Sequence, residues 1–150
     1  MTISPALAAS LTMLARVMAD ARQPWWIIGS AAAILHGAAT EAADIDVLLG
    51  VADADDLDAR LGLGLRSDRG DALFRSERYG RWLGPSVPVE FMAELAVRGA
   101  AALVPRTRVP IAVGEAIVYV PGRRDMIAIL ELFGRPKDRA RADLLRARPA

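Results

Sequence analysis

Two aspartates one residue apart form the pattern of this 150-residue chain that is best suited to chemistry. Asp44 and Asp46 stand at the start of a short apolar run that ends at Leu49. Side chains alternate between the two faces of a β-strand, so both carboxylates would lie on one face and Ile45 on the other. Carboxylates this close repel each other unless one binds a proton or a cation lies between them. The spacing therefore favours a site for a divalent cation.

A glycine and a serine upstream favour a phosphate site. Gly29 and Ser30 separate an apolar stretch, residues 25–28, from an Ala-rich segment, residues 30–35. A strand followed by a helix fits this pattern, and the first N–H groups of a helix have no partner within it, which suits a phosphate. Paired carboxylates beside bound phosphate are what metal-assisted phosphoryl transfer requires, since the ions neutralise phosphate oxygens and activate an attacking hydroxyl.

Simpler interpretations of both patterns stay open on these residues alone. An Asp-x-Asp spacing arises often by chance, and a strand with alternating acids can have one face in water and the other on the core. A Gly-Ser pair also occurs at strand-to-helix turns that bind nothing. Either pattern alone is a weak signal of function.

Composition narrows the kinds of metal site that the chain can build. Cysteine is absent and His36 is the single histidine, which excludes thiolate sites, disulfides and multi-histidine zinc sites. We interpret His36 as a packed or surface helix residue. Carboxylate ligands favour hard ions, so Mg²⁺ or Mn²⁺ is the expected cofactor. The net charge of +1 produces no overall field that would predict nucleic-acid binding.

The distribution of apolar residues predicts a protein without a membrane span. The most apolar stretch, residues 25–39, contains Ser30 and His36 and is too short to cross a bilayer. The amino terminus has no basic flank before its apolar residues, and Arg16 interrupts them, so we expect no signal peptide. A cytoplasmic location is the resulting expectation.

Helices and short strands interleave along the chain and would position these side chains. Ser4 can cap a first helix that Pro5 begins. Pro88 predicts either an edge strand or a strand start. We expect one α+β domain over residues 1–150, with helices packed on a small mixed β-sheet. The predicted helices cover residues 5–18, 30–35, 53–61, 125–133 and 137–146, the strands residues 25–28, 44–49 and 87–91, and a hairpin residues 111–113 and 116–120.

The order of these motifs resembles the nucleotidyltransferase superfamily, which includes DNA polymerase beta. The resemblance rests on the apolar strand, Gly29-Ser30, a helix, and then Asp44 and Asp46 on an apolar strand. The chain is similar in particular to small bacterial nucleotidyltransferases, including those of abortive-infection toxin–antitoxin systems and antibiotic nucleotidyltransferases. Its carboxy-terminal residues 134–138 and 142–145 also look like the closing helix of that group. The resemblance covers residues 25–50 well and residues 87–145 more loosely.

The resemblance implies a nucleotidyltransferase fold and a Mg²⁺-dependent reaction. It implies that Gly29 and Ser30 meet a nucleoside triphosphate such as ATP, and that Asp44 and Asp46 bind metal. A third carboxylate on a neighbouring strand would act as metal ligand and general base, and Glu90, between two apolar residues, fits that place. The reaction would transfer a nucleoside monophosphate to a hydroxyl of a tRNA, a protein or a small molecule, with release of pyrophosphate. A partner protein or an oligomer would complete the acceptor site.

Lys137 and Asp138 follow a Gly-Arg-Pro sequence and have two interpretations. In one, Lys137 is an exposed residue of the first helical turn and Asp138 interacts favourably with the helix dipole. In the other, Lys137 binds the triphosphate and Asp138 orients it. We take the second as the prediction for nucleotide binding.

Three positions depart from the pattern of the small enzymes. Thr40 and Ala42 stand where those enzymes often have Arg and Thr, and Leu130 stands where a Lys is common. Each missing cation removes a charge-assisted contact of about 1.5–3 kcal/mol. The alternative is therefore a binding or antitoxin module of this fold with weak or no catalysis. Residues 63–84 carry no motif to which we assign a function.

Overall fold

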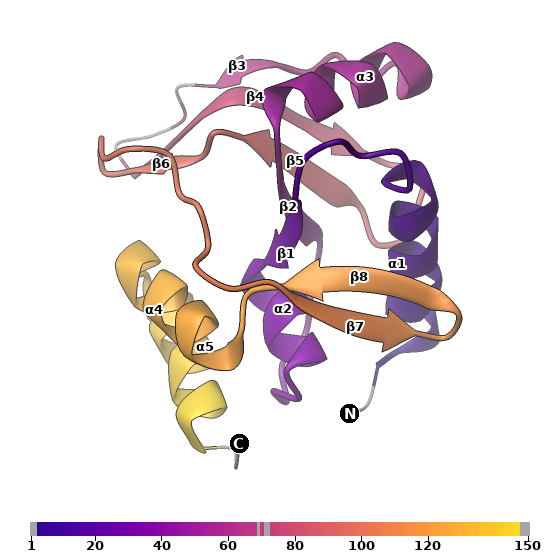
Figure 1. The fold of residues 1–150 in the computed structure, drawn as a ribbon. Coiled ribbons are helices and arrows are strands. Elements are labelled where there is room, and N and C mark those ends of the chain that lie inside the picture. Colours follow the sequence, from indigo (N-terminus) through magenta and orange to yellow (C-terminus); the bar gives the residue numbers. More distant parts are fainter. Residues whose placement is uncertain (1–2, 69, 71–72, 148–150) are drawn as a thin grey trace.

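A mixed β-sheet with helices packed on it forms the centre of the computed structural model, which describes residues 3–68, 70 and 73–147 (Figure 1). The strand order is β1-β2-β5-β4-β3, and β6 pairs with β4. Strands β2 and β5 run parallel, and the other paired strands are antiparallel. The α+β architecture predicted from the sequence is confirmed. The strands are β1 (Trp26–Ile28), β2 (Ile45–Leu49), β3 (Arg66–Asp68), β4 (Phe74–Trp82), β5 (Val89–Ala93) and β6 (Ala96–Val97).

The described helices surround this sheet, with α1 on one side of the view in Figure 1 and α4 and α5 together on the other. The first helix begins as predicted, because the Ser4 hydroxyl accepts a hydrogen bond of 3.2 Å from the Leu7 N–H. None of the described helices combines the length and the apolar composition needed to cross a bilayer. The helices are α1 (Pro5–Val17), α2 (Gly29–Leu35), α3 (Val51–Leu61), α4 (Arg123–Phe133) and α5 (Pro136–Ala147).

The predicted hairpin is confirmed as a separate two-stranded sheet, β7 (Val109–Val113) and β8 (Ala116–Val120). Gly114 occupies the turn with φ +61°, a left-handed conformation that glycine adopts without strain. The hairpin contacts both α1 and β1. It therefore covers the edge of the main sheet at which β1 lies.

Strand β5 is central, which corrects one of the two expectations for Pro88. The strand lies between β2 and β4 and pairs with both, so the edge-strand interpretation is wrong. Pro88 immediately precedes β5, where its missing N–H removes no ladder bond, and its carbonyl accepts a 2.8 Å bond from the Ile45 N–H. The parallel pairing of β2 and β5 starts at this contact.

The two faces of the sheet centre have opposite chemical character. Ile27, Val47 and Phe91 lie opposite one another in β1, β2 and β5, and all three are fully buried in the core. The adjoining row holds Ile28, Asp46 and Glu90, again opposite one another. Because successive strand residues face opposite sides, the acidic residues lie on the face away from that part of the core.

Candidate active site

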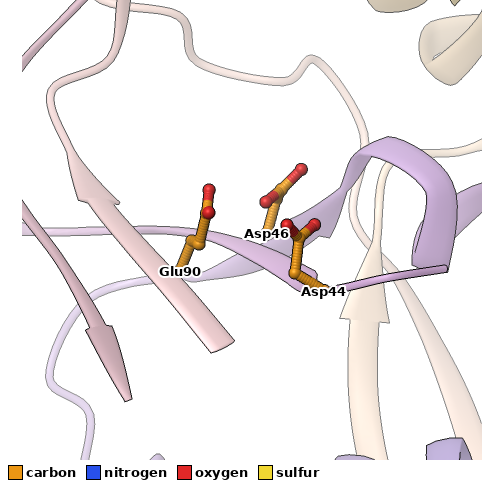
Figure 2. Close-up of side chains that lie close together, drawn as sticks. All are labelled: Asp44, Asp46 and Glu90. Carbon is orange, nitrogen blue, oxygen red and sulfur yellow. The ribbon is translucent and has the colours of Figure 1, made fainter. Parts of the chain in front are cut away.

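The three predicted acidic residues converge on one face of the sheet. Asp44, Asp46 and Glu90 each offer a carboxylate oxygen, and these oxygens all lie within 4.8 Å of one another. Figure 2 shows the three side chains projecting to the same side, two from β2 or the residue just before it and one from β5. We call these three residues the acidic cluster. Each is half-buried, so the carboxylates are partly removed from water but accessible to a ligand.

Strand register explains why residues 44 positions apart in sequence meet. In the parallel β2–β5 pair, Asp46 stands directly opposite Glu90. The two-residue period of a strand then places Asp44 on the same face as Asp46, although the strand itself begins at Ile45. On its other side Asp46 faces Ile28 of β1, the residue before Gly29. Asp46 is thus the central member of the acidic cluster.

Gly29 approaches Asp46 so closely that a side chain would not fit between them. A Cβ atom at position 29 would lie 2.7 Å from Oδ2 of Asp46, and Gly29 has φ +70°. Both the space and the left-handed backbone conformation therefore require glycine here. Ser30 follows in the first turn of α2 and is 7% exposed. The predicted Gly29-Ser30 turn thus lies directly beside the acidic cluster.

Burial and charge repulsion perturb the central carboxyl. Desolvation, the charges of Asp44 and Glu90 and a hydrogen bond with Glu90 raise the pKa of Asp46 to about 8. The positive charge of Arg135 acts in the opposite direction and lowers this pKa. At neutral pH, and without a cation between the carboxylates, Asp46 therefore retains a proton. A divalent cation would relieve the same repulsion by replacing that proton.

Strand β4 adds two side chains around Glu90. Arg81 stands opposite Glu90 in the β4–β5 pair and forms an ion pair with it, Nε to Oε1, at 3.6 Å. Partial burial, the Glu90 charge and a hydrogen bond to Glu90 raise the pKa of Tyr79 to about 12. The Tyr79 hydroxyl thus stays protonated at physiological pH and donates to the carboxylate. Glu90 is both a salt-bridge partner and a member of the acidic cluster.

A cavity of about 240 Å³ opens on the acidic cluster. Asp46 and Glu90 line one part of it, and Tyr79 contributes from β4. Arg135 lines the same cavity from the residue before α5. Residues 63–84, to which the sequence assigned no function, thus supply part of the cavity wall. We call it the cluster cavity; its other lining residues are Ile28, Asp68, Gly70, Phe74, Arg75, Ser76, Met92, Leu95 and Phe133.

The carboxy-terminal motif is arranged differently from the predicted Lys137–Asp138 pair. Asp138 is 1% exposed and accepts hydrogen bonds from the side chain of Arg135, not of Lys137. Lys137 is exposed and is not among the residues that line the cluster cavity. Sequence reasoning therefore missed Arg135 as a residue of the site. The available signal was the Arg-Pro-x-Asp spacing, since an acid at the third helical position can bond back to the residue before the helix.

A comparison with known proteins identifies the fold that carries the acidic cluster. No protein-family model matches the chain, and no curated protein matches its sequence. A crystal structure of a "putative nucleotidyltransferase" from Thermotoga maritima superimposes with a TM-score of 0.74 and covers 98% of this chain and 97% of that one. The chain has the nucleotidyltransferase fold. The sequence identity is 16%, so this similarity establishes the fold alone.

Three residues that depart from the small-enzyme pattern lie at distinct places in this nucleotidyltransferase fold. Leu130 is fully buried and belongs to the hydrophobic core, so its side chain stabilises packing of α4. Ala42 packs partly buried against the same core, and Thr40 is half-buried in the segment before β2. His36 lies at the end of α2, where its Nε2 and the Pro121 carbonyl oxygen are 2.7 Å apart. Neither these three residues nor His36 lines the cluster cavity.

Proposed function

We propose that the chain is a metal-dependent nucleotidyltransferase that transfers a nucleoside monophosphate from a nucleoside triphosphate to a hydroxyl group. The observation that carries the proposal is the acidic cluster, three carboxylates within 4.8 Å on a nucleotidyltransferase fold. The three carboxylates repel one another, and this repulsion lowers the stability of the folded protein. A purely structural role would not require such an arrangement. A bound cation would offset the repulsion between the three carboxylates.

The donor set fits a hard divalent ion. Asp44, Asp46 and Glu90 offer carboxylate oxygens, the ligands that Mg²⁺ and Mn²⁺ prefer. Cysteine is absent from the chain and no second histidine exists, which leaves softer metals without their usual ligands. A bound ion of this kind supplies positive charge to phosphate oxygens and favours ionisation of an attacking hydroxyl. The three members of the acidic cluster would hold it.

The residues around the cluster have separate parts in the proposed transfer. The acceptor oxygen forms a bond to the α-phosphorus, the bond from that phosphorus to the β-phosphate bridging oxygen breaks, and pyrophosphate leaves. A Glu90 carboxylate oxygen accepts the proton of the acceptor hydroxyl. Tyr79 and Arg81 hold Glu90 in position through their contacts with its carboxylate. Gly29, which lies beside Asp46, and Ser30, in the first turn of α2, would bind phosphate oxygens through backbone N–H groups.

Three acceptor classes suit this chemistry: the end of a tRNA, a protein hydroxyl and a small molecule. We propose ATP or another ribonucleoside triphosphate as the donor. We further propose a role in a toxin–antitoxin system, in which the acceptor would be a cellular RNA or protein. A partner protein would then contribute to the acceptor site, since the cluster cavity of about 240 Å³ is smaller than the roughly 300–1,000 Å³ of pockets that bury a whole small ligand.

Thermal unfolding with nucleotides tests the proposal directly. We expect one of the four ribonucleoside triphosphates, with Mg²⁺, to stabilise the wild type by about 2.7 kcal/mol at a hundredfold excess over its dissociation constant. Asp46→Asn should lose this shift. Asp20→Asn, an exposed site that changes the charge identically, should retain it. The triphosphate that stabilises the wild type is then incubated with candidate acceptors, and released pyrophosphate is measured.

The outcomes separate the enzyme from the alternative, a catalytically weak binding or antitoxin module. That alternative rests on Thr40 and Ala42, which replace polar or basic residues in the resemblance to small nucleotidyltransferases. Stabilisation by a triphosphate that Asp46→Asn abolishes, without pyrophosphate release for any acceptor class, would favour the module. No stabilisation by any triphosphate, with or without Mg²⁺, would contradict nucleotide binding altogether.

A further inference from the structure

Arg135 is held in one conformation at the start of α5. Its Nε lies 2.6 Å from Oδ2 of Asp138, and its Nη2 lies 3.1 Å from Oδ1 of the same carboxylate. The backbone N–H of Arg135 also donates to Oδ2 at 3.2 Å. Asp138 is buried, so this charge-assisted pair is shielded from water on the carboxylate side. We call Arg135 and Asp138 the arginine clamp.

Two aromatic rings add to the constraint on the guanidinium. Cζ of Arg135 lies 5.0 Å from the ring centroid of Phe74 and 5.9 Å from that of Phe133. Contacts within about 6 Å of an aromatic face attract a guanidinium through the ring quadrupole. The two rings pack edge to face, with centroids 5.0 Å apart, and both line the cluster cavity. The position of the guanidinium is thus set before any ligand arrives.

The clamp leaves hydrogen-bond donors of Arg135 available. A guanidinium has five N–H groups, and the bonds to Asp138 use one on Nε and one on Nη2. Among the described residues, the three remaining N–H groups, including both on Nη1, have no hydrogen-bond partner. The side chain is 38% exposed and lines the cluster cavity. A planar set of donors held in this way suits the oxygens of a phosphate.

Acidic and basic side chains line the cluster cavity, and Arg135 and Asp46 do so without direct contact. Arg135 and Asp46 both line it, and the charge of Arg135 influences Asp46, yet these two described residues form no ion pair. Glu90 pairs with Arg81 instead. Oppositely charged groups that share a cavity at a distance complement a ligand that carries both charges. A phosphate chain with a divalent cation is such a ligand, because the cation meets the acids and the phosphate oxygens meet the arginine.

We propose that Arg135 binds the phosphate chain of the nucleoside triphosphate and that Asp138 is its positioning residue. This inference rests on the proposed nucleotidyltransferase function. It assigns to Arg135 the role that the sequence alone suggests for Lys137. The two residues are two positions apart and both are basic, but only Arg135 lines the cluster cavity among the described residues. Recognition by a planar guanidinium also predicts that lysine is a poor replacement at position 135.

Titration calorimetry on the full chain compares Arg135→Gln with the control Lys137→Gln. The probes are Mn²⁺ alone and ATP, GTP, CTP and UTP, each with Mn²⁺. We expect Arg135→Gln to weaken binding of the triphosphate that the wild type prefers by about ten- to a hundredfold, the effect of losing charge-assisted hydrogen bonds. Lys137→Gln should change it by less than about threefold. Binding of Mn²⁺ alone should stay equal or become tighter in Arg135→Gln, since a repelling charge is removed.

A double variant protects the test against a folding defect. Arg135→Gln alone leaves the buried carboxylate of Asp138 without its charged partner, which destabilises a fold. Arg135→Gln combined with Asp138→Asn removes both charges and should unfold near the wild-type temperature while still binding triphosphate weakly. Asp138→Asn alone should weaken triphosphate binding less than Arg135→Gln, with unchanged Mn²⁺ binding. Arg135→Lys should restore only part of the affinity.

The controls distinguish failure of this inference from failure of the proposed function. Wild-type affinity for the triphosphate in the double variant, or equal losses in Arg135→Gln and Lys137→Gln, would overturn the role of Arg135 while leaving the metal site intact. If the wild type itself bound no triphosphate with Mn²⁺, and Asp46→Asn behaved identically, the proposed function would fail and this inference with it.

Discussion

The acidic cluster and the arginine clamp hold charge in opposite ways. In the cluster, three carboxylates lie within 4.8 Å of one another, and among the described residues only Glu90 of the three forms an ion pair, with Arg81 at 3.6 Å. In the clamp, Arg135 and Asp138 neutralise each other at 2.6 Å, and the carboxylate is buried. The cluster is therefore destabilising until a cation or proton joins it. The clamp compensates its own charges, and Arg135 still presents to the same cavity N–H groups that have no hydrogen-bond partner among the described residues.

This contrast indicates which charges in a fold are maintained for a ligand. A satisfied pair such as the clamp can serve folding alone, because it satisfies its own charges. A cluster of like charges on adjacent strands opposes folding, so its presence points to a ligand that compensates it. The clamp gains a functional interpretation only through its position in the cluster cavity. If the acidic cluster is maintained for a ligand, changes to it should alter activity, cation binding and the pH dependence of stability.

The largest expected effect belongs to Glu90→Gln. The substitution keeps the shape of the side chain but removes the negative charge that would bind the divalent cation. It also removes the carboxylate that is the proposed proton acceptor. We expect transfer activity to fall by at least about a hundredfold, since even outer partners of a metal contribute ten- to a hundredfold. The control is Glu94→Gln, because Glu94 is exposed, lies beyond the end of β5 and does not line the cluster cavity. Similar activities in the two variants would contradict the assignment of Glu90.

The stability of the protein should depend on pH through the acidic cluster. Folding raises the pKa of Asp46 from 3.8 to about 8, so between these values the folded state binds more protons than the unfolded state. The free energy of unfolding should therefore fall as pH rises from about 4 to 8. Thermal unfolding at several pH values without divalent ions measures this. The unfolding temperature of Asp46→Asn relative to the wild type should increase over the same window, and Mn²⁺ should flatten the wild-type curve. A difference between the two proteins that does not change with pH would contradict the repulsion.

Gly29→Ala should damage the cluster through the backbone. Its Cβ would lie 2.7 Å from Oδ2 of Asp46 and displace that carboxylate. Gly62→Ala is the matched control, because Gly62 has φ +64° and its added Cβ would meet nothing within 4 Å. Both variants should lose about 1–2 kcal/mol of stability from the left-handed conformation. We expect only Gly29→Ala to lose Mn²⁺ affinity, by roughly tenfold. Titration calorimetry with Mn²⁺ measures this. Equal Mn²⁺ affinities in Gly29→Ala and Gly62→Ala would contradict the close approach of Gly29 to Asp46.

Tyr79→Phe has the smallest expected effect. The hydroxyl donates to Glu90 and stays protonated, because the pKa of Tyr79 is about 12. Loss of one hydrogen bond of about 0.5–1.5 kcal/mol should reduce transfer activity by about two- to tenfold without changing the fold. Tyr119→Phe serves as control, since Tyr119 lies in the hairpin against Trp25 and outside the cluster cavity. Unchanged activity in Tyr79→Phe would mean that Arg81 alone positions Glu90.

Local sequence signals predicted much of the fold because they act within a few residues. The Ser4 cap of the first helix and the hairpin over residues 111–120 each depend on near neighbours, and the structure confirms both elements. The common face of Asp44 and Asp46 follows from the strand period alone. Element ends differed by one or two residues, as at β2, which begins at Ile45 instead of Asp44.

Features that depend on distant residues were misread or left open. Asp53 is the first residue of a predicted helix, yet it is buried and accepts hydrogen bonds from the Arg22 and Gln23 N–H groups at 2.9 and 3.0 Å. The sequence carried no sign that N–H groups some thirty residues earlier would meet this carboxylate. Pro88 suggested an edge because proline lacks an N–H, but its place just before the strand removes the conflict.

The sequence by itself determined which chemical groups are present. These are a pair of aspartates on one strand face and a glycine-serine turn before a helix, without thiol or multi-histidine ligands. The tertiary structure decided which groups meet. Parallel pairing of β2 and β5 sets Glu90 opposite Asp46, and the bond to buried Asp138 directs Arg135 instead of Lys137 toward the site. Strand period and helix caps are local and readable, whereas register and side-chain pairing depend on packing across the whole chain.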